Sequence, residues 1–244
     1  MLDTLYFSGF CELWFTIGRG SRVYLIPRPS LTKSVIVYIG GGEYNEKITI
    51  LQNKLSVIFY DGKRVGEQTL ALRVSGNKLA LFNCRLIGFQ DKLCDDRGNH
   101  FFKDFFIEGT VDFIFGSGKS LYLNTELHML GNNEMTVITA QARDSASEDT
   151  GYSFVHCNIT GTGNGTYLGR AWRTSPRVVF AYTSMSEVIT LACWNNKNRP
   201  KRDSTVFHGE YKCSGPDSSM VERVKYTKQL NEEQVKPFLS LGYI

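Results

Sequence analysis

Proline is scarce in this sequence, and long hydrophobic runs are missing. The 244 residues include 6 prolines against 23 glycines, a balance that suits many short turns. No apolar run is long enough to cross a membrane as a helix. Amphipathic helical periodicity is nearly absent outside segment 228–240, which argues against a helical fold. Aromatic residues make up 13% of the chain, and this favours β-strands.

A strong excess of one charge is also lacking. Lys and Arg number 28 and Asp and Glu 24, which gives a formal net charge of +4. This mildly basic balance favours an anionic partner without identifying one. The one dense basic stretch, 197–202, is short and resembles no nucleic-acid-binding module. We therefore predict a solvated loop there and expect no nucleic acid as a partner.

Cysteines are few and unclustered. The six cysteines form no Cys-x-x-Cys pair, and with the four histidines they form no metal-ligand cluster. Their even number fits disulfides in a secreted protein and fits buried thiols equally well, so no pairing is assigned. The first 20 residues are interrupted by Asp3 and Glu12 and lack a basic start, which makes a poor signal peptide.

Short apolar runs bounded by Gly, Asn and Asp dominate the chain. Each contains β-branched or aromatic residues, which is typical of strands. The predicted strands are 35–39, 56–60, 70–74, 79–82, 100–107, 110–115, 119–123, 135–139, 152–156 and 177–182, and a short helix is predicted at 228–240.

A weak internal repeat connects some of these strands. Segments 82–88, 102–109 and 154–161 each begin with Phe and end with Gly, and the first two Phe lie 20 residues apart. A strand repeat of this length indicates a solenoid, which for strands is a parallel β-helix. A β-sandwich is the alternative, but it requires hairpin dipeptides such as Asn-Gly, and this dipeptide occurs only at 164–165. We therefore favour the solenoid.

Two aspartates stand out because each follows a strand-like run. Asp91 ends segment 88–91 (Gly-Phe-Gln-Asp), and Asp112 lies 21 residues later in segment 109–116 (Gly-Thr-Val-Asp-Phe-Ile-Phe-Gly). Neighbouring strands of a parallel sheet lie about 4.8 Å apart, so residues one coil apart stack on the same face. We expect the two carboxylates to lie within a few ångströms of each other.

Two carboxylates this close cannot both ionise freely, so one pKa rises while the other stays low. Such a pair can supply an acid and a nucleophile near neutral pH. For Asp91 alone, a turn role is the alternative, because Asp beside Gly usually forms turns. Asp112 has no such role inside Val-Asp-Phe-Ile-Phe, and burying a carboxylate without a purpose is costly.

Several segments resemble the pectinesterase family. Segment 107–116 is similar to the family signature, and segment 88–93 (Gly-Phe-Gln-Asp-Lys-Leu) is similar to its Gln-Asp motif. Further blocks of the family are matched in order at 42–46, 68–73, 168–172 (Leu-Gly-Arg-Ala-Trp) and 206–211. The resemblance implies an all-β fold, a right-handed single-stranded parallel β-helix with a short C-terminal helix. It covers residues 33–244 and leaves residues 1–32 unassigned.

The resemblance also implies an activity and catalytic residues. The activity is that of a carboxylic ester hydrolase that removes methyl esters from the galacturonate units of pectin and releases methanol. Asp112 is expected to be the nucleophile, and Asp91 the acid and then the base. Gln90 is expected to stabilise the oxyanion.

Three more residues are assigned to the site by the same resemblance. Gln68 is expected to be a second amide donor that binds the substrate. Arg170 is expected to fix the Asp112 carboxylate and keep it ionised. Trp172 is expected to stack on a sugar ring.

The family pattern is shortened at one place. Only residues 63–67 lie between segment 60–62 (Tyr-Asp-Gly) and Gln68, where the family has a stretch worth roughly two coils. A solenoid tolerates the loss of whole coils because each coil contacts only its neighbours. One alternative function is therefore a catalytically impaired pectin-binding homologue. Another is a different pectin-active β-helix enzyme such as a polygalacturonase, which would also use paired aspartates.

The resemblance implies no metal or organic cofactor, and it implies partners and a location. The expected substrate is methyl-esterified homogalacturonan (pectin), and a proteinaceous pectinesterase inhibitor is a further expected partner. The protein is expected to be a monomer secreted to the cell wall, with no membrane as a partner.

Overall fold

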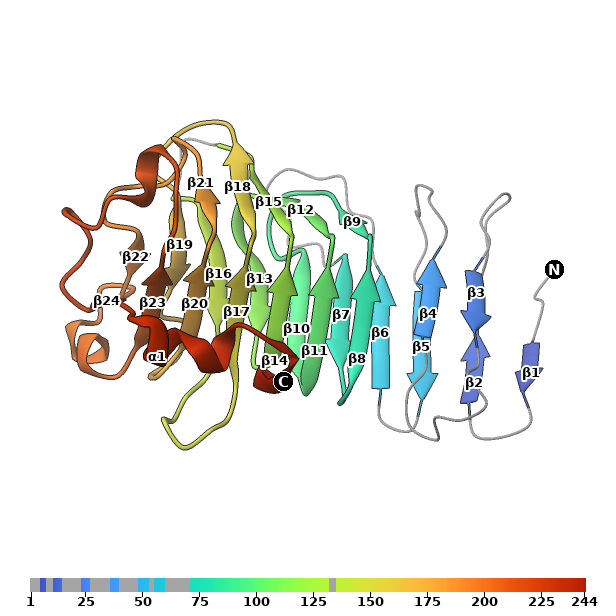
Figure 1. The fold of residues 1–244 in the computed structure, drawn as a ribbon. Helices are drawn as coiled ribbons and strands as arrows, with labels where there is room; N and C mark the ends of the chain where they lie inside the picture. The colour runs from blue at the N-terminus through green and yellow to red at the C-terminus, as the bar shows by residue number, and fades with distance from the viewer. Residues whose placement is uncertain are drawn as a thin grey trace.

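The computed structural model describes residues 71–131 and 135–244 in full, together with the backbone of six earlier strands (Figure 1). These six strands are β1 (Leu5–Phe7), β2 (Cys11–Trp14), β3 (Val23–Ile26), β4 (Ile36–Ile39), β5 (Ile48–Gln52) and β6 (Leu55–Phe59).

From β7 to β21 the chain winds through three sheets and contributes one strand to each sheet per coil (Figure 1). The first sheet contains β7 (Leu72–Ser75), β10 (Leu93–Arg97), β13 (Val111–Gly116), β16 (Val137–Gln141), β19 (Tyr167–Arg170) and β22 (Trp194–Asn195). The second contains β8 (Leu79–Phe82), β11 (Asn99–Lys103), β14 (Lys119–Leu123), β17 (Gly151–Val155), β20 (Arg177–Ala181), β23 (Phe207–Tyr211) and β24 (Thr227–Gln229). The third contains β9 (Arg85–Leu86), β12 (Phe106–Gly109), β15 (Glu126–Met129), β18 (Asn158–Gly161) and β21 (Ser184–Met185).

All strand pairs within these coils are parallel, and each strand pairs with the strands one coil before and after it. The predicted parallel β-helix is therefore confirmed. A β-sandwich is excluded for this part of the chain because its sheets would be built from antiparallel pairs.

The strands before β7 pair differently. Strand β6 is antiparallel to both β5 and β7, β2 is antiparallel to β1 and β5, and β3 and β4 form a separate antiparallel pair. The strands predicted at 35–39 and 56–60 correspond to β4 and β6. Parallel coils are thus present from β7 onward, and the predicted start of the domain at residue 33 stays a prediction.

The corner between the second and third sheets is made by one left-handed residue in each coil. These residues have φ between 46° and 57° and are Asn83, Asp104, Asn124, His156, Tyr182 and Lys212. Asn and Asp tolerate this conformation better than other residues with a side chain. The prediction of a single strand at 100–107 was wrong, because Asp104 turns the chain there from β11 into β12.

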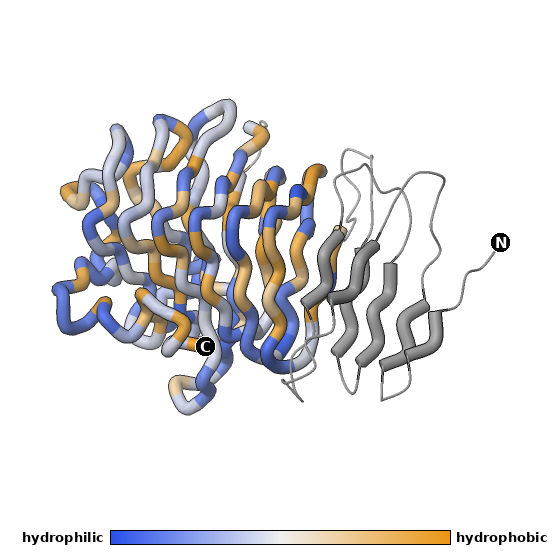
Figure 2. Tube along the Cα trace, turned by 45° about the vertical axis from the view of Figure 1, so that its right-hand side comes forward, coloured by the Kyte–Doolittle hydropathy of each residue, from blue (hydrophilic) through white to orange (hydrophobic). Residues whose placement is uncertain are grey.

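Stacked aromatic rings fill the interior along the second sheet. Tyr122 stacks on Phe102 with ring centroids 4.6 Å apart and on Phe154 at 4.5 Å, and Phe154 stacks on Phe180 at 4.5 Å. Hydrophobic and hydrophilic residues both occur along the coils, as the colouring of Figure 2 shows. The predicted repeat was one residue out of register, because Phe102 pairs with Leu81 and not with Phe82.

The C-terminal segment packs against the outer face of the second sheet (Figure 1). It contains α1 (Glu232–Val235) and the 3₁₀ turns Lys236–Phe238 and Leu241–Tyr243, while earlier 3₁₀ turns lie at Pro200–Ser204 and Pro216–Ser218. Asn231 caps α1 in a capping box with Gln234. The helix is shorter than the predicted 228–240, because Asn231 begins it late and Pro237 lacks the N–H that would continue it.

A buried ionic network crosses the interior of the first described coils. His100 and Asp95 are both fully buried, and their Nδ1 and Oδ1 atoms lie 2.6 Å apart. The other ring nitrogen of His100 lies 2.8 Å from the carbonyl oxygen of Gly76, and Tyr122 donates to Asp95 at 2.7 Å. Burial alone would lower the pKa of His100, but the charge and hydrogen bond of Asp95 outweigh it and raise this pKa. Both ring nitrogens face acceptors, so the network holds an imidazolium.

This network predicts that the fold loses stability as the pH rises. Because the pKa of His100 is raised on folding, its contribution is complete below the ordinary value of about 6.5 and is lost as pH rises through the folded-state value. Removing one member of a buried ion pair costs about 3–5 kcal/mol, so His100→Gln should reduce the free energy of unfolding by about that amount at pH 6.

Urea unfolding at a series of pH values between 6 and 9 measures both effects. His156→Gln is the matched control, because His156 lies exposed at a coil corner. If His100→Gln and wild type lost stability equally over this pH range, His100 would not be the responsible group.

Candidate active site

Asp91 and Asp112 lie at the start of two adjacent strands of the first sheet. Asp91 precedes β10, and Asp112 is the second residue of β13. Leu93 pairs with Ile114 in this sheet, so the register between the two coils is 21 residues, the spacing of the two aspartates. The N–H of Asp91 donates to the carbonyl oxygen of Val111 at 3.2 Å. The structure therefore places the two aspartates level with each other on neighbouring coils.

The backbone at both aspartates is left-handed. Asp91 has φ 57° and Asp112 has φ 50°. The chain reaches Asp112 through a tight turn in which the Thr110 N–H donates to the carbonyl oxygen of Phe89 at 2.8 Å. Gly109 is required in this turn, because a Cβ there would lie 2.4 Å from the Cβ of Phe113. A side chain at Gly109 would thus displace the strand that carries Asp112.

The two oxygens of Asp112 have different surroundings. Asp112 is 3% exposed, and its Oδ2 accepts a hydrogen bond from the guanidinium of Arg170. Its Oδ1 is buried and has no hydrogen-bond partner among the described residues, and neither has Nε of Arg170. Arg170 ends β19, which lies two strands from β13 in the first sheet. Arg170 therefore anchors one oxygen of Asp112 and leaves the other free to react.

Burial and neighbouring charges shift the pKa values of the two carboxyls. The pKa of Asp91 is raised to about 6, because burial and the negative charge of Asp112 together outweigh the opposing charges of Arg170 and Lys92. Burial also raises the pKa of Asp112, and the hydrogen bond and charge of Arg170 and the charge of Lys197 oppose this rise. The hydrogen bond and charge of Arg170 favour the ionised form of Asp112, and the negative charge of Asp112 in turn favours the protonated form of Asp91.

Trp172 follows shortly after Arg170 and is 39% exposed. The guanidinium carbon of Arg170 lies 5.2 Å from the centre of the Trp172 ring, and Nζ of Lys197 lies 3.9 Å from it. The prediction of a solvated loop at 197–202 agrees with the exposure of Lys197, but the side chain of this residue also contacts the Trp172 ring. Arg202 is also engaged, since its guanidinium donates to the carbonyl oxygen of Ala171.

Sequence reasoning missed two cations beside the aspartates. Lys92 is fully buried next to Asp91. Lys197 lies on the coil that follows the coil of Trp172, and it contacts the Trp172 ring. Lys197 lies 25 residues after Trp172, and Gly169 pairs with Trp194 at the same interval. The lengths of successive coils vary too much along the chain for this contact to be inferred from spacing alone.

The two predicted glutamines are not equally placed. Gln90 is half-buried in the turn before β10, directly beside Asp91. Gln68 lies outside the described residues. The structure thus brings together Gln90, Asp91, Asp112, Arg170 and Trp172.

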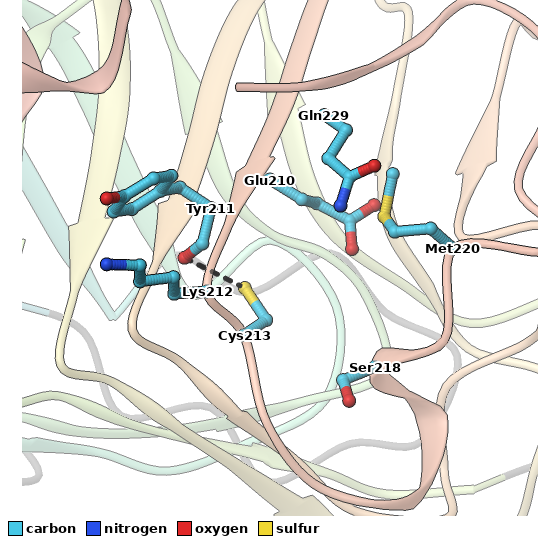
Figure 3. A pocket seen from close by; sticks show the side chains of 7 residues that line it. All are labelled: Glu210, Tyr211, Lys212, Cys213, Ser218, Met220 and Gln229. Carbon is cyan, nitrogen blue, oxygen red and sulfur yellow. Dashed lines mark hydrogen bonds between the residues drawn. The ribbon is translucent and has the colours of Figure 1, made fainter. Parts of the chain in front are cut away.

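A small hollow lies at the C-terminal end of the parallel β-helix (Figure 3). Its volume is about 90 Å³, and it is lined by Glu210, Tyr211, Lys212, Cys213, Ser218, Met220 and Gln229. The Glu210 carboxylate accepts hydrogen bonds from Arg223 at 3.1 Å and from Nε1 of Trp194 at 3.0 Å. This carboxylate is saturated by structural contacts, so the hollow is a poor candidate for chemistry.

Within the described residues, no helix has the length and apolar character needed to cross a bilayer. In residues 71–131 and 135–244, His, Cys, Asp and Glu side chains form no group of three that could hold a metal ion.

Comparison with known proteins identifies the family. The family model described as Pectinesterase matches residues 62–244. The chain belongs to the pectinesterase family. Over 294 aligned residues it is 45% identical to a sequence described as pectinesterase 63 of Arabidopsis thaliana. This alignment covers 97% of this chain and 87% of the relative. It is 52% identical to pectinesterase 2 of Olea europaea, over 75% of this chain and 50% of that one.

Solved structures of this family have the same fold. The pectin methylesterase from carrot matches with a TM-score of 0.64 at 28% identity, over 68% of this chain and 56% of that one. The pectin methylesterase from Aspergillus niger also matches with a TM-score of 0.64 at 28% identity, over 72% of this chain and 58% of that one. The predicted right-handed parallel β-helix is confirmed.

The chain is short for its family. It spans about half the length of the olive relative and of the two solved structures. The alignment with the pectinesterase 63 sequence is longer than this chain, so it includes positions that the chain lacks. This agrees with the shortened pattern seen in the sequence, although the place of the shortening, predicted between residues 62 and 68, lies outside the described residues.

The coupling of the two carboxyls predicts a change in the titration of Asp91. Replacing Asp112 by Asn removes the charge that raises the pKa of Asp91, so this pKa should fall from about 6. A carbon NMR titration of the Asp91 carboxyl measures it. Asp104→Asn is the control, since Asp104 lies at a corner between other sheets. An unchanged pKa of Asp91 in Asp112→Asn would show that the two groups do not interact.

Proposed function

We propose that this protein is a carboxylic ester hydrolase that removes methyl esters from the galacturonate units of pectin and releases methanol. The observation that carries the proposal is the state of Asp112. It is buried, anchored through Oδ2 by Arg170, free at Oδ1, and level with a carboxyl whose pKa is raised. Membership of the pectinesterase family supports the same activity and does not favour a polygalacturonase.

In the first half of the reaction, Oδ1 of Asp112 attacks the carbonyl carbon of the methyl ester. The carbonyl oxygen becomes an oxyanion, which the side-chain amide of Gln90 stabilises as a hydrogen-bond donor, with Gln68 as the second amide. Asp91 gives its proton to the methoxy oxygen as the C–O bond breaks, and methanol leaves. An acyl-enzyme anhydride on Asp112 remains, and Asp91 is now ionised.

In the second half of the reaction, the Asp91 carboxylate takes a proton from a water molecule as that water attacks the anhydride. The bond to Asp112 breaks, which restores the Asp112 carboxylate and leaves a galacturonic acid carboxyl on the polymer, which releases its proton to the solvent and becomes a carboxylate. Asp91 is protonated again and ready for the next ester. Arg170 holds Asp112 in position throughout, because its hydrogen bond restricts the carboxylate to one orientation.

Trp172 is the proposed sugar-binding residue, since an exposed aromatic ring close to the reacting carboxylates suits stacking against a sugar ring. The substrate we propose is methyl-esterified homogalacturonan. A proteinaceous pectinesterase inhibitor as a partner, a monomeric state and secretion to the cell wall belong to the same proposal and rest on family membership.

Methanol release from methyl-esterified pectin by the purified protein tests the function directly. Asp112→Asn should lower the rate by several orders of magnitude, because an amide replaces the nucleophilic carboxylate. Binding of pectin, measured by calorimetry, should stay nearly unchanged, since the substitution keeps the shape of the side chain. Asp104→Asn is the control and should keep the wild-type rate.

Two results would contradict the proposal. If Asp112→Asn retained a substantial fraction of the wild-type rate, Asp112 would not be the nucleophile. If wild type bound pectin but released no methanol, the protein would be the impaired pectin-binding homologue.

A further inference from the structure

Two segments of the chain have the acceptor sequence for an N-linked glycan, and neither takes part in the proposed reaction. They are segment 158–160 (Asn-Ile-Thr) and segment 164–166 (Asn-Gly-Thr). Such a segment can carry a glycan only where the folded surface leaves room for the sugar. Asn158 and Asn164 are both exposed, so their surroundings distinguish the two segments.

Asn164 lies in the loop that leaves the third sheet after β18 and enters the first sheet at β19. Its two neighbours, Gly163 and Gly165, have φ 79° and φ 80°. A Cβ built on Gly165 would meet no atom within 4 Å, so the space beside the Asn is open. Among the described residues, none forms a hydrogen bond with the Asn164 side chain. A glycan on its Nδ2 atom would therefore break no contact of the fold.

Both ends of this loop are fixed, although its middle is open. At the start, the Thr162 N–H donates to the carbonyl oxygen of Met129 at 2.9 Å, and the Thr162 hydroxyl accepts from the N–H of Gly131 at 3.1 Å. At the end, the Thr166 N–H donates to the carbonyl oxygen of Val188 at 2.9 Å. These bonds tie the loop to the coils before and after it, so the fold presents the exposed middle of the loop in one place.

Asn158 has less room around it. It is the first residue of β18, where it is level with Glu126 on one neighbouring coil and with Ser184 on the other. Strands of a sheet lie about 4.8 Å apart, so a sugar ring on Asn158 would lie over the side chains of both neighbours. The Thr160 hydroxyl of the same segment donates to Oε1 of Glu126 at 2.9 Å and lies 2.8 Å from Nδ1 of His128. The loop at Asn164 is therefore the better place for a glycan.

The Thr166 hydroxyl determines when a glycan can be added. Thr166 is 1% exposed, and its Oγ1 atom lies 2.7 Å from Oγ1 of Thr136 on the previous coil. The transferase recognises the hydroxyl of the acceptor sequence as well as the Asn. This hydroxyl is out of its reach in the folded protein, so transfer has to precede the pairing of β19 with β16.

We propose that Asn164 carries an N-linked glycan, which is added before the coil of β19 folds. In this step Nδ2 of Asn164 attacks the anomeric carbon of an oligosaccharide that is carried on a lipid pyrophosphate. The bond between that carbon and the pyrophosphate oxygen breaks, the lipid pyrophosphate leaves, and Nδ2 gives one proton to the solvent. The inference rests on the secretion that is part of the proposed function, and it does not depend on the esterase activity.

Cell-free translation of the full chain behind a secretion leader, in the presence of microsomes, tests the site. Protection from added protease selects the chains that have entered the microsomes, and mass spectrometry of the peptide that contains residue 164 detects the sugar. Wild type should carry it. Asn164→Gln and Thr166→Val should lose it, because they remove the acceptor amide and the hydroxyl, whereas Thr166→Ser keeps the hydroxyl and should retain it. Asn158→Gln is the matched control and should leave the glycan on Asn164 unchanged.

A second experiment tests the order of events. Full-length protein that is made in bacteria and folds without a glycan should stay unmodified when it is incubated with the detergent-solubilised transferase and the lipid-linked oligosaccharide. Modification of Asn164 in this folded protein would show that the proposed order is wrong.

The site itself would be refuted by a translated wild type without sugar on the Asn164 peptide, or by a Thr166→Val variant modified as fully as wild type. Because the leader is supplied, these results are independent of methanol release. Glycosylated wild type that releases no methanol would overturn the proposed function alone, and active wild type without the glycan would overturn this inference alone.

Discussion

The parallel pairing of strands on adjacent coils is the constraint on which the site depends. It places residues of different coils level with each other along one sheet, whatever the length of chain between them. Asp91 and Asp112 meet across an interval of 21 residues, and Trp172 and Lys197 across one of 25. The interior aromatic stack from Phe102 to Phe180 follows the same rule. One repeated geometry thus produces both the core and the reactive surface.

Burial then determines the chemical behaviour of the carboxylates that this geometry brings together. A carboxylate removed from water is unstable unless it is paired, and among the described residues Asp112 is paired at only one oxygen. The fold holds Oδ1 where no described residue donates a hydrogen bond to it, because Arg170, Gly109 and the β13 backbone keep Asp112 in place. Asp95 shows the contrasting case. It is also buried, but His100 and Tyr122 satisfy both of its oxygens, and it is structural.

The shortness of the chain is compatible with an intact site. The described coils carry Gln90, both aspartates, Arg170 and Trp172, and each coil contacts mainly its two neighbours. In a solenoid, the loss of coils at one place leaves the register elsewhere unchanged, since pairing is local. The C-terminal segment covers the outer face of the second sheet, on which Ser153 donates to the carbonyl oxygen of Phe238 at 2.7 Å. It therefore protects the coils that hold the site.

The sequence by itself determined the fold class, the family and the identity of the two aspartates, because strand patterns and the motifs around Asp91 and Asp112 are local. It placed most strands but merged β11 with β12, since a left-handed Asp104 leaves no clear mark on hydrophobicity. Only the tertiary structure decided that Lys197 meets Trp172, and that one oxygen of Asp112 has no hydrogen-bond partner in the described part of the chain. These are contacts between coils of unequal length, and their register is set by backbone hydrogen bonding across the sheet and not by any pattern within one coil.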